Sequence, residues 1–198
     1  GTQAGDPGPH HDDLHETVLH MEKKLADKLL RVEKSPNGST RDLLLDTGIT
    51  LIGTVGSRQA SARAVEDASG VPHGSVRHHF GGQSGFLAAL VEHVFSADRA
   101  AEGESTQEVI VRWLGTDRVR TRARYELMLL ATRDDDLRHV MVGHRERYVD
   151  GLVDGGLTRT EARQLVAALD GLVLDALLRN SDGTDSDHDP TTLLRAFR

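Results

Sequence analysis

The stretch from Ser61 to Phe80 constrains the fold of this chain more than any other part of its sequence. Apolar residues recur at helical spacing on both sides of Gly70: Ala62, Val65 and Ala68 before it, and Val76 and Phe80 after it. Ser61 is a good N-cap for the first of these two helices. Pro72 suits the first turn of the second helix, where a missing N–H has no cost. Two short helices joined by a turn that contains glycine are typical of a helix-turn-helix, whose second helix enters the major groove of DNA.

The same stretch resembles the recognition-helix signature of the tetracycline-repressor (TetR) family of bacterial transcription regulators. The resemblance is carried by Gly70-Val71, Gly74-Ser75-Val76 and His78-His79-Phe80, by residues 44–52, which are similar to the family's first helix, and by residues 84–90, which resemble the start of its fourth. Three residues depart from the family pattern: Arg77 stands in place of a tyrosine that contacts phosphate, Gln83 in place of a lysine, and Glu66 in place of a small alanine packed between the helices.

The resemblance implies an all-α protein in which an N-terminal three-helix helix-turn-helix DNA-binding domain precedes a C-terminal helical ligand-binding and dimerisation domain. We expect an N-terminal extension in residues 1–39, the DNA-binding domain in 40–84 and the ligand-binding and dimerisation domain in 85–198. Apolar spacing predicts an extra amphipathic helix within residues 12–33. Three roles remain open for this helix: docking on its own protein, binding a partner or DNA, or forming a frayed tail.

The composition excludes several function classes. The chain of 198 residues has no cysteine, which excludes disulfides, thiol catalysis and zinc sites built from cysteine. It has no apolar run of about 18 residues and no secretory signal, so we expect a cytoplasmic protein without a membrane span. It also has no nucleophile elbow and no glycine-rich phosphate loop, so we expect neither an enzyme nor a bound cofactor.

Two groups of residues resemble metal sites without the full pattern. His11 and His15 are four residues apart, as a helical metal pair requires, but they lie in a tail without cysteine. The acidic segment from Asp182 to Asp189 lacks the closing glutamate of an EF-hand. We therefore expect no metal site and interpret the acidic segment as a solvated loop.

The net charge of −7, with no strongly basic segment, argues mildly against nucleic-acid binding. Counterion release should be modest, and helix N-termini and hydroxyl groups would supply phosphate contacts without net charge. The alternative function is a regulator-like helical module that binds a protein partner with little or no specific DNA binding. A shallow salt dependence without sequence preference would favour that alternative.

The last long helix carries more apolar surface than one core needs. Thr158 and Glu161 match a capping box at its start. A single helix-turn-helix reads few bases, whereas a symmetric dimer reads a palindrome. We therefore expect a homodimer, with burial of this helix inside one subunit as the alternative. The resemblance implies that residues 134–154 and 160–179 form the interface, and the candidate residues are Leu165, Leu169, Gly171, Leu172 and Ala176.

The DNA-binding candidates lie at helix starts and along the second helix: Ser61, His73, Gly74, Ser75, Arg77 and His78. The resemblance implies that Ser75 contacts phosphate, and Arg77 can pair with guanine or phosphate. We expect His79 and Phe80 to pack or cap instead. Because three histidines lie in this helix and its turn, the affinity for DNA should rise as the pH falls through about 6.5.

The resemblance also implies a small-molecule effector site in the C-terminal helices. Each candidate is a residue type that is more often ordinary core: Trp113, Tyr125, Met128, Met141, His144 and Tyr148. This mixture favours a mostly apolar effector with one or two polar groups. The sequence thus predicts a ligand-responsive repressor that leaves its palindromic operator when the effector separates the two recognition helices.

Overall fold

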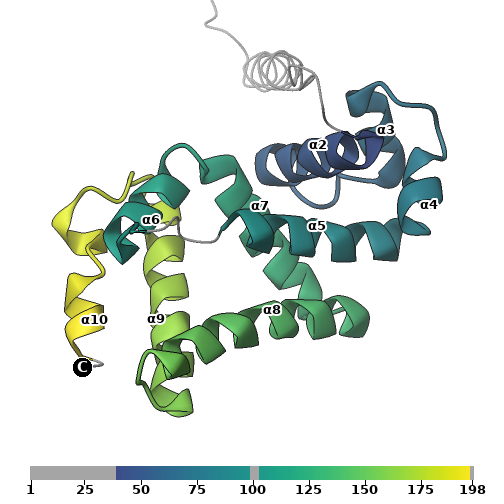
Figure 1. The fold of residues 1–198 in the computed structure, drawn as a ribbon. Helices are drawn as coiled ribbons and strands as arrows, with labels where there is room; N and C mark the ends of the chain where they lie inside the picture. Colours follow the sequence, from purple (N-terminus) through teal and green to yellow (C-terminus); the bar gives the residue numbers. More distant parts are fainter. Residues whose placement is uncertain (1–38, 99–102, 197–198) are drawn as a thin grey trace, which may run out of the picture. The chain divides into compact units, whose positions relative to one another are not determined.

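The computed structural model describes residues 39–98 and 103–196, which belong to one compact unit. All regular structure in these ranges is helical, which confirms the all-α prediction (Figure 1). The elements are α2 (Thr40–Val55), α3 (Ala62–Ser69), α4 (Ser75–Phe80), α5 (Gln83–Ala97), α6 (Thr106–Leu114), α7 (Arg118–Ala131), α8 (Asp135–Asp154), α9 (Arg159–Leu178), the 3-10 helix η1 (Ser186–His188) and α10 (Thr191–Ala196). None of these helices is long and apolar enough to cross a membrane. The helix predicted within residues 12–33 and the His11–His15 pair lie outside the described residues.

Side-chain caps predicted from the sequence set the starts of α3 and α9. The Ser61 hydroxyl accepts the backbone N–H of Ala64 at 3.2 Å, so the predicted N-cap of α3 is confirmed. The predicted capping box of α9 is also confirmed, because the Thr158 hydroxyl accepts the N–H of Glu161 and the Glu161 carboxylate accepts the N–H of Thr158. These two helices therefore begin where local chemistry satisfies their free N–H groups.

Helices α2 and α7 cross with their backbones in contact. A Cβ atom at Gly53 of α2 would lie 2.0 Å from the carbonyl oxygen of Val119 in α7. Only glycine allows this approach, because any side chain would overlap the α7 backbone. Helix α2 also packs on α3 and α5 around the fully buried Leu44, Ile52 and Phe86. The helix-turn-helix thus rests on α2 and α5, and α7 connects α2 to the helices that follow.

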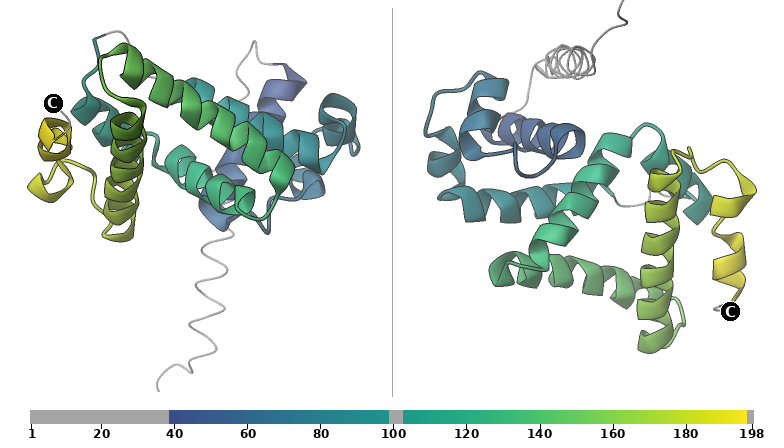
Figure 2. Two further views of the ribbon diagram at one scale, coloured as in Figure 1. Left: turned by 90° about the horizontal axis from the view of Figure 1, so that it is seen from below. Right: turned by 180° about the vertical axis from the view of Figure 1, so that it is seen from behind.

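The C-terminal helices pack around α9. Helices α6, α8 and α10 each contact α9, and α8 also packs against α5 (Figures 1 and 2). A buried cluster of Ile110, Leu114, Val173 and Ala176 joins α6 to α9. This cluster forms a second apolar core, separate from the one beneath the helix-turn-helix.

A buried ion pair lies among aromatic rings where α5 ends. Arg124 of α7 donates to the Asp98 carboxylate at 3.0 Å, and both side chains are buried. The Arg124 guanidinium lies 4.2 Å from the ring centroid of Trp113 and 5.3 Å from that of Tyr125. Burial raises the pKa of Asp98, and the positive charge of Arg124 opposes that rise. The mutual charge and the ring contacts offset part of the desolvation of the pair.

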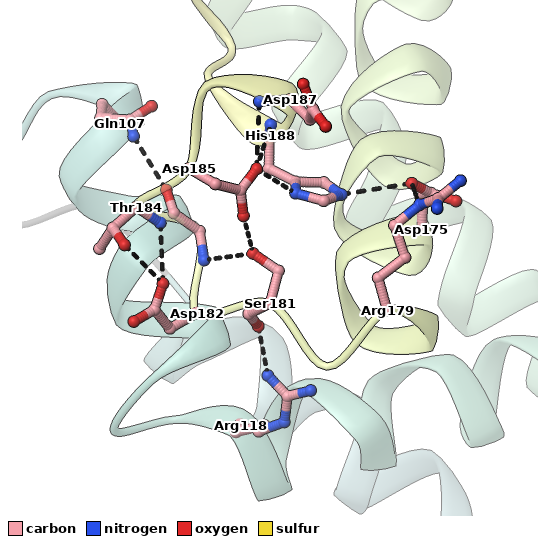
Figure 3. Close-up of polar contacts among 11 residues, drawn as sticks. Gln107, Arg118, Asp175, Arg179, Ser181, Asp182, Thr184, Asp185, Asp187 and His188 are labelled. Carbon is pink, nitrogen blue, oxygen red and sulfur yellow. Dashed lines mark hydrogen bonds and ion pairs between the residues drawn. The ribbon is translucent and has the colours of Figure 1, made fainter.

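The acidic segment after α9 is a loop, as predicted. Its carboxylates are not all solvated, because some of them form hydrogen bonds within the protein. The buried ring of His188 contacts Asp185 at 2.7 Å and Asp175 of α9 at 3.2 Å (Figure 3). Asp185 also accepts hydrogen bonds from the Ser181 hydroxyl and from the Asp187 N–H. The loop is therefore fastened to α9 by an internal polar network. No group of three metal-ligating side chains occurs in the parts of the chain that the structure describes.

Candidate DNA-binding and ligand sites

Helices α3 and α4 form the helix-turn-helix (Figure 1). Gly70 ends α3 with a φ of 66°, and Gly74 precedes α4 with a φ of 91°. Both values lie in the left-handed region, which favours glycine. Because Gly74 adopts this conformation, α4 begins at Ser75 and not near Pro72 as predicted. Pro72 lies in the turn, where its carbonyl accepts the Ser75 hydroxyl at 2.6 Å.

Most residues predicted to contact DNA are accessible on the surface. Ser61, His73, Gly74, Arg77 and His78 are exposed, and Ser75 is half-buried. His79 is exposed too, although its ring meets those of His78 and Phe80 edge-on, with centroids 4.9 and 6.2 Å apart. Phe80 does pack: its ring meets that of Phe86 in α5 edge-on, with centroids 5.0 Å apart. The recognition helix thus packs on α5 through an aromatic contact and leaves the side chains of Arg77 and His78 exposed.

Glu66, one of the departures from the family pattern, caps the recognition helix. Its side chain is buried, and its Oε1 accepts the backbone N–H of Gly74 at 3.1 Å and that of Val76 at 2.8 Å. Its Oε2 lies 3.5 Å from Nδ1 of His73. The hydrogen bond from Val76 holds the pKa of Glu66 below the ordinary glutamate value, although burial acts in the opposite direction. The carboxylate is therefore ionised at neutral pH and satisfies the first N–H groups of α4.

Gln83, a second departure, caps α3. Its side-chain Oε1 accepts the N–H of Ala62 at 3.0 Å. Side chains of the protein therefore accept hydrogen bonds from the N–H groups of Ala62, at the start of α3, and of Gly74 and Val76, at the start of α4. The sequence had predicted that N–H groups at helix starts would bind phosphate, but these three already have partners. These caps could not be predicted from local sequence, because the capping side chains lie 8, 10 and 21 residues away from the N–H groups whose hydrogen bonds they accept. Local capping motifs span only three residues.

A cavity of about 620 Å³ lies between α5 and α8, and its walls are made by Glu92, Phe95, Ser96, His144, Arg147 and Tyr148. The rings of Phe95 and His144 are stacked, with centroids 4.9 Å apart and planes 15° apart. The ring of Tyr148 lies 6.2 Å from that of Phe95. Glu92 contacts Nε2 of His144 at 2.9 Å and lies 4.0 Å from Arg147, so a cationic partner balances its charge. The site presents a flat aromatic wall with a polar edge.

This cavity brings together two of the six predicted ligand residues, His144 and Tyr148. The other four lie elsewhere: Met141 is buried on α8, Met128 is half-buried on α7, and Trp113 and Tyr125 pack against the buried α6–α9 cluster. The Tyr125 hydroxyl donates to the carbonyl of Asp170 at 2.7 Å, and burial raises its pKa to about 12. Tyr125 therefore acts as a structural donor between α7 and α9.

The outer side of α9 carries an apolar stripe of exposed residues at spacings of four, three and four: Ala167, Gly171, Leu174 and Leu178. Leu174 is 42% exposed and Leu178 is 78% exposed. Gly171 is the one predicted interface residue on this stripe. Leu169 and Leu172 are half-buried, and Leu165 and Ala176 pack inside the protomer. Heptad spacing of this kind suits packing against a partner helix.

A hydrogen-bonded contact joins the loop after α2 to α7. Ser57 donates its backbone N–H, at 3.3 Å, and its hydroxyl, at 2.8 Å, to Oε2 of Glu126. Because α7 also contacts α5 and α8, which form the cavity walls, this contact belongs to a continuous path between the cavity and the helix-turn-helix. No sequence motif indicated it.

A helix-turn-helix with an exposed recognition helix, joined to a helical body with an aromatic cavity, defines a transcriptional regulator of the helix-turn-helix class. Residues 96–198 match the family described as tetracyclin repressor-like, C-terminal domain. The chain therefore belongs to the tetracycline-repressor (TetR) family, which confirms the family prediction. Members of this family are transcription factors without enzymatic activity, so the prediction that the chain is not an enzyme is also confirmed.

Solved structures share this fold. SCO1917, a TetR-family member from Streptomyces coelicolor A3, is 29% identical, with a TM-score of 0.66 over 81% of this chain and 99% of its own. The multidrug binding protein EbrR, complexed with ethidium, is 28% identical, with a TM-score of 0.65 over 81% and 99%. A TetR-family transcriptional regulator from Rhodococcus sp., at 21% identity and a TM-score of 0.63 over 79% and 97%, supports the fold alone. No curated protein matches the chain.

Proposed function

We propose that this chain is a repressor that binds a palindromic operator as a homodimer and is released by a small, mostly apolar effector. The single observation that carries the proposal is the accessible recognition helix, with exposed Arg77 and His78, and exposed His73 in the turn before it, on a chain of the TetR family. Arg77 supplies the bidentate donor that reads guanine in the major groove. In this proposal, residues 40–84 bind DNA, and residues 85–198 bind the ligand and form the dimer.

The proposed dimer surface is the apolar stripe on α9, whose residues are exposed in the protomer. Large exposed apolar side chains are costly in water, and a two-fold axis through such a stripe would bury Leu174 and Leu178 twice. Leu165 and Ala176 support the stripe from inside the protomer. A dimer of this kind presents two recognition helices to half-sites about one helical turn, or a multiple of it, apart.

The proposed effector is a flat aromatic molecule that lies against Phe95 and Tyr148. The stacked rings of Phe95 and His144 offer a planar surface, while Glu92 and Ser96 offer polar contacts at its edge. EbrR, which is similar to this chain, has been crystallised with ethidium, proflavin and malachite green. These ligands are consistent with the shape of the present cavity. Because Arg147 already balances the charge of Glu92, we do not expect the cavity to select strongly for cationic ligands.

The geometry supports a route from the cavity to DNA along α5. This helix carries Phe95 and Glu92 at the cavity and Phe86 at its other end, against Phe80 of the recognition helix. An effector that forces α5 and α8 apart would tilt α5 and carry α4 with it. The two recognition helices of a dimer would then miss successive grooves, which is a shift of population between two states.

Selection of operators from a random duplex pool, followed by fluorescence anisotropy, tests the DNA-binding part. The Arg77→Ala variant should weaken operator binding by about 1–3 kcal/mol and relax specificity at one base. Arg122→Ala, which removes an equal charge from the exposed side of α7, is the matched control and should bind normally. Failure of the wild-type protein to enrich any duplex would refute the proposal.

Calorimetry of the protein with malachite green tests the effector part without DNA. Phe95→Ala should abolish or strongly weaken the binding, because it removes the aromatic wall. Tyr125→Phe removes a hydroxyl that lies outside the cavity and should leave the binding unchanged. Equal dye binding by wild type and Phe95→Ala would show that this cavity is not the effector site.

A further inference from the structure

We infer that Glu66 is a positioning residue for DNA recognition, which sets the orientation of α4 from inside the helix-turn-helix. The inference rests on the proposed DNA binding by α4. Glu66 belongs to α3, yet its Oε1 accepts hydrogen bonds from the N–H groups of Gly74 and Val76. These two residues flank Ser75, the first residue of α4. These two hydrogen bonds fix the start of the recognition helix relative to the helix that precedes it.

The recognition helix needs such an external cap because its own sequence provides none. Gly74 occupies the N-cap position and has no side chain to accept an N–H. Helix α4 is also short, with 6 residues, so its first turn is a large part of the whole helix. Without a cap, short helices are marginal. The Glu66 carboxylate therefore replaces the serine, threonine or aspartate that would ordinarily start a helix.

Burial of a carboxylate is costly unless hydrogen bonds satisfy it. Glu66 is 5% exposed and obtains those bonds from the recognition helix itself. Movement of α4 away from α3 would leave both the carboxylate and the two N–H groups without partners. This mutual dependence gives the recognition helix one preferred orientation before DNA is bound. Preorganisation of this kind strengthens binding because less ordering is required on association.

The same carboxylate places a negative charge near DNA, and that charge predicts the opposite effect on affinity. If Glu66 acted mainly through charge, its removal would reduce repulsion from phosphates and strengthen binding. If it positions α4, its removal weakens binding. Asp67 provides the matched control, since it is the next residue on α3, carries the same charge, is 57% exposed and accepts no backbone N–H of α4 in the described contacts.

The test compares operator affinity of wild type with Glu66→Ala, Glu66→Gln and Asp67→Asn by fluorescence anisotropy at fixed salt. We expect Glu66→Ala to bind roughly 2- to 30-fold more weakly, the range for a lost helix cap. Glu66→Gln keeps an oxygen acceptor in the same place and should fall between Glu66→Ala and wild type. Asp67→Asn should bind as well as wild type or slightly better, because it removes a charge that lies 3.4 Å from His73, as Glu66 does at 3.5 Å, but leaves the hydrogen bonds from Gly74 and Val76 intact.

Amide hydrogen exchange by NMR on the free protein gives a readout that does not depend on DNA. The amide protons of Gly74 and Val76 should exchange faster in Glu66→Ala, whereas those of the α9 core should not change. Glu66→Ala introduces the small residue typical of the family at this position, so a thermal melt should show that the variant is folded.

The outcomes separate this inference from the proposed function. If wild type enriches no operator, the proposed function fails. If wild type binds but Glu66→Ala binds as tightly or more tightly, with unchanged exchange at Gly74 and Val76, the positioning role is overturned and the proposed function stands.

Discussion

Replacement of Leu178 by aspartate should dissociate the proposed dimer. Leu178 is 78% exposed in the protomer, so most of its side chain is available for burial against a partner. Full burial of a leucine side chain stabilises by about 1.5–3 kcal/mol. The available fraction therefore corresponds to roughly 1–2 kcal/mol for each copy. A two-fold symmetric interface buries this side chain twice, which doubles the contribution to about 2–4 kcal/mol.

The aspartate destabilises the dimer further, because one carboxylate from each protomer would be buried in an apolar interface. The dimer dissociation constant should therefore rise by at least about 100-fold. Sedimentation velocity over a range of concentrations measures this constant directly. Leu129→Asp is the matched control, since Leu129 is 62% exposed but lies on α7, beside the loop after α2. A Leu178→Asp protein that stays dimeric, or a Leu129→Asp protein that dissociates, would refute the assignment of the α9 stripe as the dimer surface.

Three further predictions concern stability. Asp98→Ala should cost about 3–5 kcal/mol in urea unfolding, because it leaves the Arg124 guanidinium buried without its carboxylate, and Asp98→Ala with Arg124→Met should cost less than the single change. Gly53→Ala should destabilise by up to about 3 kcal/mol in the same assay, because its methyl group overlaps the Val119 carbonyl. Glu66 has a lowered pKa when folded, so its stabilisation is complete above the ordinary glutamate pKa of about 4.3 and is lost as the pH falls below it. Glu66→Gln should therefore flatten the decline in melting temperature between pH 5 and pH 3, and an unchanged slope would contradict the shift.

Features with local determinants were predictable from the sequence. The Ser61 cap, the Thr158 capping box and the glycine turn at Gly70 each depend on residues within a few positions of one another. The helix-turn-helix followed from them, because apolar spacing, a turn glycine and cap chemistry agree in this stretch. The start of α4 was predicted too early, since Pro72 suits a helix start as well as the turn that it occupies.

Features that depend on contacts between distant elements were not predictable. Helix α9 has apolar residues around much of its circumference, so spacing alone does not show which side faces the protomer's own core. The structure turns Leu165 and Ala176 inward and leaves Leu174 and Leu178 outside. Phe95 fitted the apolar face of its helix, and nothing in its spacing indicated that it stacks with His144 beside a cavity.

The close approach of Gly53 to α7 also constrains how this regulator can be re-engineered. A chimera that joins another DNA-binding domain to the C-terminal helices of this chain would need glycine at the matching position of its first helix. With any larger residue, the DNA-binding domain would be displaced from α7 by about the width of a methyl group or would tilt. The graft would then present its recognition helices at an altered separation, and the preferred spacer between operator half-sites would change with it.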